Sequence, residues 1–396
     1  MNILNQSLIT VFFCICLFPF SITLLGSGAS ASYFFLFIPF FLLIKFGKIK
    51  NPGSDINLII FIFTIFFFLN AFLQIDYWEL TIRKIISFLL FFSVFCLVFF
   101  DISKNMERSF LIAIVLVSLF FSLRSIYYLV QLDLNAVGFA AKGEVGSQRF
   151  GFIYLMAFWI VFFYKPIKMY HAWLKVASMS ILLLGIFLTF SRSSIIGLIF
   201  SVFIYMFFFM KLSNVFKIKN FLWLILLLPI VIYLIYRFNI DLILILIFDF
   251  FWERMFSLLT FSEAKSVELL NFSNPESSEG YRLFLIQKII NYSSSNFLGS
   301  GFLGIWIILD DFIGSAHGQY NDILFRTGFF GLILYIYLLC KLWVFLRYHN
   351  PALFVGFNAT LIYGLFHETF KLGQGSFVLA FILALWATSL RNRKIK

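Results

Sequence analysis

The stretch SAHGQYNDILFRTGFFGLILYIYLLCKL, residues 315–342, passes from a polar segment into an apolar run within a few positions. An apolar run of about 20 residues can cross the hydrocarbon core of a bilayer as a helix. Such runs recur along the whole chain, in which 62% of the 396 residues are hydrophobic and 12% are charged. Soluble domains contain about 45–50% apolar and about 25% charged residues. The sequence therefore predicts an integral membrane protein.

Twelve membrane-spanning helices are expected where apolar runs alternate with charged or turn-forming residues. They are residues 8–26, 31–46, 56–73, 84–100, 110–130, 150–165, 175–190, 193–210, 221–237, 322–342, 351–367 and 374–390. One long, mostly polar insertion, residues 238–321, separates the ninth run from the tenth. We therefore expect an all-α polytopic protein in which residues 1–396 form a single transmembrane domain.

The long insertion is not uniform in composition. Its start, residues 238–256, contains an apolar run that is too short to cross a bilayer and is bracketed by Asp241, Asp249 and Glu253, which predicts an interfacial or re-entrant helix. The stretch SNPESSEGYR, residues 273–282, has the composition of a turn-rich linker. No internal repeat is visible, which argues against transporter folds built from duplicated halves.

Lys and Arg in the short connections predict the sidedness of the chain, because these residues are concentrated in cytoplasmic loops. With the N-terminus in the cytoplasm, every inner connection is basic; the residues are Lys45, Lys48, Lys50, Lys104, Arg108, Lys165, Lys168, Lys175, Lys211, Lys217, Lys219, Lys341, Arg347, Arg391, Arg393, Lys394 and Lys396. The outer short connections hold Arg83, Lys84, Lys142, Arg149, Arg192 and Lys371. We expect both termini in the cytoplasm and residues 238–321 on the outer side.

Charge and cysteine usage exclude several classes of partner. The formal net charge of +12 does not predict a nucleic-acid partner, since the basic residues lie in short clusters between apolar runs. All four cysteines fall inside apolar runs, where a thiol behaves as a small hydrophobe, so no disulfide framework or zinc site is expected. Asp310 and Asp311 are adjacent and would point in different directions on a helix. We expect no metal and no cofactor.

Arginines recur at the expected outer ends of the spans, against the usual bias toward the cytoplasmic side. They are Arg149, Arg192, Arg282 and Arg326. Arg192 alone would also fit a side chain that snorkels at the end of a span. As a group, outer arginines predict an anionic ligand, because the guanidinium fork matches phosphate oxygens. Arg124, inside the fifth span, is either a further member of the group or a buried structural ion.

Other polar residues lie at the same expected outer side. His317, Asn321 and Asp322 precede the tenth span, His367 and Glu368 close the eleventh, and Tyr281 adjoins Arg282. The side chain of histidine titrates near neutral pH and suits acid and base catalysis. His171 and His349 lie in inner basic loops, and we interpret them as solvated residues at the membrane interface.

Three motifs, taken in order, resemble the O-antigen ligase and O-antigen polymerase superfamily. They are FSRSS at 190–194, GYRLFLIQKII at 280–290 with GSGFLG at 299–304, and AHGQYNDILFRTGFFG at 316–331. In that family a loop histidine precedes a Gly-x-x-Gly motif by eleven residues, and His317, Gly328 and Gly331 keep this spacing. The family has Asn directly after the histidine, whereas this chain has Gly318. The resemblance covers about residues 140–345.

The resemblance implies a metal-independent membrane glycosyltransferase of the GT-C type in the bacterial inner membrane. Its donor would be a glycan carried on undecaprenyl pyrophosphate, bound at the outer face. Carried over by position, the catalytic residues would be Arg192, Arg282 and His317. Beside these, the polar residues of the outer side that we expect to bind substrate are Arg149, Arg326, Asn321, Tyr281, His367 and Glu368. Glu368 with His367 is the reserve candidate for the base. His317 would act either as the base for the acceptor hydroxyl or as a hydrogen-bond donor to the pyrophosphate.

Three activities remain open. A polymerase would transfer the growing glycan to another lipid-linked repeat, and we favour it because FSRSS and AHGQYNDILFRTG are closer to that branch. A ligase would transfer the glycan to the lipid A core. A flippase or transporter for the same lipid-linked glycan is a lesser alternative. Expected partners are the lipid-linked oligosaccharide and membrane lipid, and a chain-length regulator would be compatible.

Overall fold

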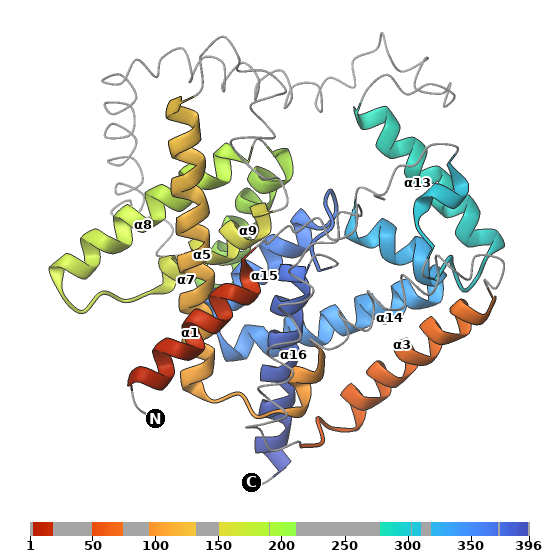
Figure 1. The fold of residues 1–396 in the computed structure, drawn as a ribbon, viewed down its shortest axis with the longest axis horizontal. Coiled ribbons are helices and arrows are strands. Elements are labelled where there is room, and N and C mark those ends of the chain that lie inside the picture. Colours follow the sequence, from red (N-terminus) through yellow and green to blue (C-terminus); the bar gives the residue numbers. More distant parts are fainter. Residues whose placement is uncertain are drawn as a thin grey trace, which may run out of the picture.

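The computed structural model describes residues 3–18, 50–73, 95–131, 150–189, 191–210, 278–301, 303–309, 318–370 and 373–394. Within those ranges every regular element is a helix, so the all-α prediction is confirmed. In chain order they are α1 (Ile3–Leu17), α3 (Ser54–Leu73), η2 (Cys96–Phe99), α5 (Lys104–Gln131), α7 (Gly151–Phe163), α8 (Met169–Leu188), α9 (Arg192–Phe209), α13 (Ser278–Ser295), η6 (Ile305–Ile308), α14 (Gln319–His349), α15 (Pro351–Tyr363) and α16 (Gly373–Lys394). Figure 1 shows their arrangement.

The described helices are those of a polytopic membrane protein. Four are long and apolar enough to cross a bilayer, namely Lys104–Tyr128, Met169–Leu188, Gln319–His349 and Gly373–Asn392. Shorter apolar helices cover Gln6–Leu17, Gly151–Phe163, Ser193–Phe209 and Pro351–Tyr363. The expected spans 31–46 and 221–237, most of 84–100, and the interfacial helix at 238–256 lie outside the described residues. The count of twelve spans stays a prediction.

The core forms around α7, α15 and α16, which lie at the centre of the bundle (Figure 1). Residues 152–159, 353–359 and 377–387 of these helices are all buried, which agrees with their apolar composition on every face. Gly356 allows α15 to approach α7 closely, since a Cβ at Gly356 would lie 3.0 Å from the Cα of Met156. Small residues at helix contacts permit this kind of packing in membranes.

The expected tenth span, residues 322–342, is not one continuous helix. α14 breaks at Gly328, whose φ of 62° and ψ of −171° are not helical. The break separates a short helix, residues 319–327, from a long helix, residues 329–349. Gly328 is needed there because a Cβ would lie 1.9 Å from the carbonyl oxygen of Phe297. The polar residues before Gly328 therefore form a separate segment rather than the end of a span.

α13 lies inside the long insertion and was not predicted. It begins within residues 273–282, so the interpretation of that whole stretch as a linker is wrong. Leu285 and Ile289 of α13 are 0% and 1% exposed, and they belong to one apolar cluster with Leu324 and Phe325 of the short helix. Turn-forming residues at the start of α13 become helical because the helix gains this apolar partner.

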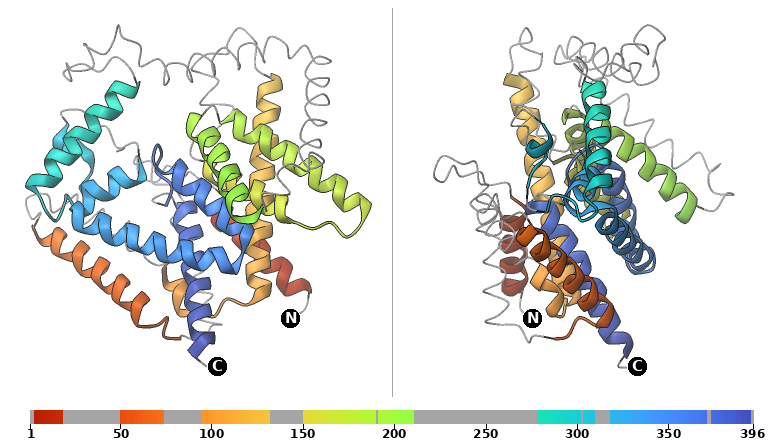
Figure 2. Two further views of the ribbon diagram at one scale, coloured as in Figure 1. Left: turned by 180° about the vertical axis from the view of Figure 1, so that it is seen from behind. Right: turned by 90° about the vertical axis from the view of Figure 1, so that its right-hand side faces the viewer.

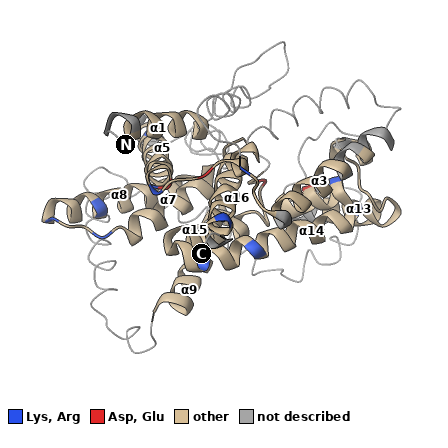
Figure 3. Cartoon of the chain, turned by 90° about the horizontal axis from the view of Figure 1, so that it is seen from below, with Lys and Arg blue, Asp and Glu red and all other residues tan. Residues whose placement is uncertain are grey.

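Lys50 and Arg391, from two predicted inner connections, lie together around Asp101. Both chain ends lie at the lower side of the bundle in Figure 2. Asp101 accepts a hydrogen bond from Nε of Arg391 at 2.8 Å and forms an ion pair with Lys50. Arg391 also donates to the carbonyl oxygens of Val98 and Phe100, at 3.0 Å and 2.7 Å. Seen from this side, Lys and Arg also mark α8, α14 and the end of α16 (Figure 3). The cytoplasmic location of this side, and of both termini, stays a prediction.

Substituting Asp101 should give a pH-dependent loss of stability. Burial would raise the pKa of Asp101, but hydrogen bonds and charge from Lys50 and Arg391 outweigh it and hold that pKa below its ordinary value. A carboxyl group whose pKa is lowered on folding stabilises the folded state above its unfolded-state pKa, and this stabilisation disappears as pH falls through the folded-state pKa.

We therefore expect the detergent-solubilised Asp101→Asn protein to unfold at a lower temperature than the unsubstituted protein at pH 7. The difference should begin to shrink once the pH falls below about 4, where the carboxyl group of the unfolded chain becomes protonated, and it should disappear below the lower pKa of the folded protein. Thermal unfolding curves between these pH values measure it. A difference that stays constant over the whole range would contradict the charge interaction.

Candidate functional site

Three segments meet at the predicted outer side of the bundle. They are the turn between α8 and α9 (residues 189–194), the start of the short helix (residues 318–320), and the end of α15 with the following turn (residues 361–370). We call this meeting point the outer junction. Its backbone is closely joined, because the N–H of Gln319 donates to the carbonyl oxygen of Gly364 at 2.8 Å. The side-chain Oε1 of Gln319 accepts from the N–H of Thr369 at 3.0 Å.

The FSRSS motif forms the first part of the outer junction, and its three serines form a buried hydrogen-bonded group there. Ser191, Ser193 and Ser194 are all buried, and Thr189 beside them is 1% exposed. The hydroxyls of Ser191 and Ser193 hydrogen-bond to each other. Thr189 Oγ1 and Ser194 Oγ are 2.9 Å apart, and the hydroxyl of buried Tyr363 also hydrogen-bonds within this group. We call these five residues the hydroxyl cluster.

The hydroxyl cluster was missed by sequence reasoning, although a signal for it existed. Hydroxyl groups inside an apolar bundle must find hydrogen-bond partners, so three serines in one apolar stretch predict a local polar network. The network stabilises the turn at which α9 begins. Arg192, predicted as catalytic, is the first residue of α9.

His367 lies at the edge of the hydroxyl cluster. Its Nε2 is 3.1 Å from the hydroxyl of Ser191, which is 176 residues earlier in the chain. Its ring stacks on the ring of Tyr363, with centroids 5.0 Å apart and an interplanar angle of 29°. His367 and Glu368 are both partly exposed. The junction thus brings His367 next to the FSRSS turn, while the predicted substrate-binding role of both residues stays a prediction.

The GSGFLG motif closes the end of the short helix. The N–H groups of Ser300 and Gly301 donate to the carbonyl oxygens of Phe325 and Arg326, at 2.8 Å and 2.9 Å. The last carbonyl groups of a helix have no partner within it and need such donors. Ser293 at the end of α13 donates in the same way to the carbonyl oxygen of Leu324, at 3.2 Å. The insertion is therefore fastened to the short helix by backbone and side-chain hydrogen bonds.

Arg326 is part of the same fastening. Its Nε lies 2.9 Å and 3.1 Å from the two carboxylate oxygens of Asp322, one helical turn earlier. Its Nη1 donates to the carbonyl oxygen of Leu303 at 3.2 Å and reaches that of Gly301 at 3.5 Å. Asp322 is 4% exposed. These contacts give Arg326 a structural role, beside which the predicted contact with substrate stays a prediction.

Asn321 lies in the first turn of α14 and is partly exposed. A Cβ added to Gly318 would lie 3.1 Å from the side-chain nitrogen of Asn321 and 2.9 Å from the carbonyl oxygen of Leu365. The amide of Asn321 therefore fills the space into which a side chain at position 318 would extend. Its predicted substrate contact is neither shown nor contradicted by this position.

Of the other predicted site residues, some are described only in part. Tyr281 and Arg282 belong to α13, where Arg282 precedes the buried Leu285 by three residues. His317 and Arg149 lie outside the described residues. Their next neighbours in the chain are described, and Phe150 stacks on Phe121 at a centroid distance of 4.9 Å.

Arg124 does not fit the interpretation as a buried structural ion. Its side chain is exposed, and its guanidinium lies 5.2 Å from the ring centroid of Tyr128 and 5.9 Å from that of Phe121. A cation over aromatic faces in this way needs no acidic partner. The alternative of a buried structural ion is therefore wrong.

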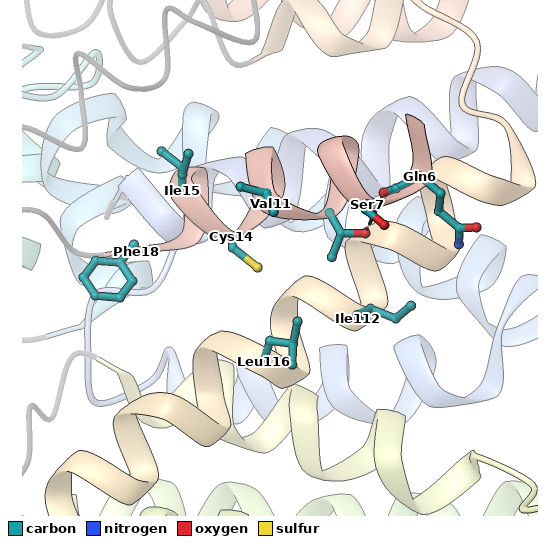
Figure 4. Close-up of a pocket in the computed structure, with 9 residues that line it drawn as sticks. Gln6, Ser7, Val11, Cys14, Ile15, Phe18, Ile112 and Leu116 are labelled. Carbon is teal, nitrogen blue, oxygen red and sulfur yellow. Dashed lines mark hydrogen bonds between the residues drawn. The ribbon is translucent and has the colours of Figure 1, made fainter. Parts of the chain in front are cut away.

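Among the described residues, no three His, Cys, Asp or Glu side chains lie close enough together to hold a metal ion. Asp310 and Asp311 lie outside those residues. The described part of the chain also has an apolar groove of about 480 Å³ between α1 and α5 (Figure 4). It is lined by Gln6, Ser7, Thr10, Val11, Cys14, Ile15, Phe18, Ile112 and Leu116. None of these residues belongs to the outer junction.

Residues 177–336 match the protein-family model described as O-antigen ligase. The matched segment includes most of α8, all of α9 and α13, and the short helix of α14. It ends before α15 and the turn that carries His367. No curated protein matches the chain at a significant level.

Proposed function

Because the chain belongs to the O-antigen ligase and O-antigen polymerase superfamily over residues 177–336, we propose that it is a membrane glycosyltransferase of surface-polysaccharide synthesis. The donor would be a glycan on undecaprenyl pyrophosphate, and the acceptor a hydroxyl group at the outer face of the bacterial inner membrane. The observation that carries the proposal is the outer junction, where the FSRSS turn, the start of the short helix and the turn with His367 meet.

Contacts between described residues support a site at the outer junction. The start of α7 packs against the hydroxyl cluster, since a Cβ added at Gly151 would lie 2.4 Å from the hydroxyl oxygen of Ser194. The start of α9, which carries Arg192, is therefore close to the start of α7. His317 and Arg149 are assigned to the proposed site by their positions in the sequence.

The second catalytic arginine in the proposal is Arg282 on α13. Helix positions three and seven residues apart share a face, and Arg282 stands in this relation to Leu285 and Ile289. Those two side chains are packed against the short helix, whose first residues join the outer junction. The contact supports a site in which α13 brings its arginine toward the same segment.

Glycosyl transfer from a pyrophosphate requires both positive charge and a proton acceptor in one site. The bond between the sugar C1 and the pyrophosphate oxygen breaks as the bond from C1 to the acceptor oxygen forms, and the leaving pyrophosphate gains negative charge. Arg192 and Arg282 would stabilise that charge, and the N-terminus of α9 adds a favourable partial positive charge. The acceptor hydroxyl must lose its proton, and His317 would accept it. If His317 instead donates a hydrogen bond to the pyrophosphate, Glu368 is the reserve base that would accept the proton.

We favour the polymerase reaction, with the ligase reaction as the alternative. The lipopolysaccharide of a deletion strain, separated on a gel, distinguishes them. A core that carries only one repeat, without the ladder of longer chains, would support a polymerase. Bare core with accumulated lipid-linked polymer would mean a ligase. Loss of every repeat would favour a flippase and contradict the glycosyltransferase.

Arg192→Lys tests whether a positive charge is enough at the start of α9. Lysine keeps the charge but loses the planar fork that contacts two phosphate oxygens. We expect glycan extension at least about tenfold slower, which corresponds to losing one charge-assisted hydrogen bond. Initial rates in membranes with equal amounts of protein measure it. Full activity of the lysine variant would contradict recognition by the fork.

A further inference from the structure

His367 links the starts of two helices, α7 and α9. Through Nε2 it contacts the hydroxyl of Ser191, directly before Arg192 at the start of α9. Through its ring it stacks on Tyr363. Tyr363 in turn packs against the start of α7, since a Cβ on Gly151 would lie 2.6 Å from Cε2 of Tyr363. One imidazole is therefore in contact, directly or through one ring, with both helix starts.

The segment that carries His367 is itself well fastened. It follows α15, and its backbone is joined to the short helix by the two hydrogen bonds of Gln319, a residue that is 3% exposed. Thr369 and Tyr363, on either side of His367, are 0% exposed. A histidine on a rigid segment that hydrogen-bonds a buried hydroxyl group can hold the position of the neighbouring turn.

We propose that His367 is a positioning residue of the transferase site. It would set the separation of the starts of α7 and α9, and so the position of the turn at which Arg192 begins α9. The inference rests on the proposed function. It assigns His367 no proton transfer, because its contribution comes from the hydrogen bond to Ser191 and from the stack on Tyr363.

The hydrogen bond and the titrating ring can be separated by substitution. Glutamine places an amide near the position of Nε2 and keeps a hydrogen bond to Ser191, but it does not titrate. Alanine removes both the hydrogen bond and the stacked ring. Tyr363→Phe keeps the stacked ring and removes the hydroxyl group from the cluster. His171→Ala is the matched control, because His171 lies at the start of α8 in a predicted inner loop.

The experiment measures glycan extension by the full-length protein in membranes, with lipid-linked repeat units as both donor and acceptor and with rates normalised to protein amount. We expect His367→Ala to lower kcat about tenfold, and His367→Gln to lower it less than about threefold with an unchanged pH profile. Ser191→Ala combined with His367→Ala should cost less than the sum of the two single costs, since the two substitutions remove one shared hydrogen bond. His171→Ala should match the unsubstituted protein.

Several results would overturn the inference. His367→Gln as inactive as His367→Ala, with one limb of the pH profile lost, would make His367 a proton-transfer group. Full activity of His367→Ala would remove any role for it. A loss explained entirely by lower protein amount, with kcat unchanged, would make the contact merely structural. Absence of extension by the unsubstituted protein would instead contradict the proposed function, so the two failures are distinguishable.

Discussion

In the Gly328→Ala variant we expect glycan extension to be lost while the protein still inserts in the membrane. Gly328 has φ 62° and ψ −171°, a combination that is essentially restricted to glycine, and it costs other residues roughly 1–3 kcal/mol. The added Cβ would also lie 1.9 Å from the carbonyl oxygen of Phe297, so the loop before α14 would have to move. Both effects act at the point where the insertion meets the short helix.

The expected consequence follows from what the loop holds. A displaced Phe297 would take with it the N–H groups of Ser300 and Gly301, which are hydrogen-bonded to the end of the short helix. α13, with Arg282, would then lose its fixed position relative to the outer junction. The lipopolysaccharide ladder of a complemented deletion strain measures the loss of extension. Trypsin added to the outer side should cleave α13 faster in the variant, for example at the exposed Lys288.

Gly53→Ala is the matched control for this variant. Gly53 also has a positive φ, of 110°, but a Cβ there would meet no atom within 4 Å. It therefore introduces backbone strain without a collision, at the predicted inner side. We expect its ladder to be normal. A normal ladder from Gly328→Ala as well would show that the short helix does not depend on this close approach.

Hydropathy was sufficient for the helical class, whereas the assignment of sides stays a prediction. Lys50 and Arg391 were assigned to inner connections and both contact Asp101, while Arg192 and His367 were assigned to the outer side and His367 contacts Ser191, the neighbour of Arg192. These outcomes depend on apolar run length and on the distribution of Lys and Arg, which are local properties of a chain.

The errors have a common physical cause, which is tertiary contact. Glycine in an apolar run predicts only backbone freedom, so the break at Gly328 depends on the approach of Phe297. The start of α13 contains turn-forming residues, and it is helical because Leu285 and Ile289 gain partners far along the chain. The pairing of Arg326 with Asp322 was also missed, but in this case the sequence holds a signal, because a spacing of four residues on a helix predicts such a pair.

His317→Ala and Arg282→Ala should each abolish glycan extension with the protein amount unchanged. A group that takes or gives a proton in the transition state contributes about 10²–10⁴-fold to a rate, and a donor to developing negative charge contributes about 10²–10³-fold. Losses of this size would leave no ladder on a gel. Both residues act on the same transition state, so their effects should not multiply. The double variant should extend glycans at most about tenfold more slowly than the slower of the two single variants.

Arg108→Ala is the control for the arginine, because its exposed side chain lies in a predicted inner connection and carries no assigned part in transfer. It should extend glycans normally. For the histidine, His317→Gln separates the two roles left open: a hydrogen-bond donor to pyrophosphate would be partly replaced by the amide, whereas a base would not. Polysaccharide of normal length from His317→Ala or Arg282→Ala would remove that residue from the mechanism, and retention in both would end the case for cationic stabilisation with imidazole-assisted proton transfer.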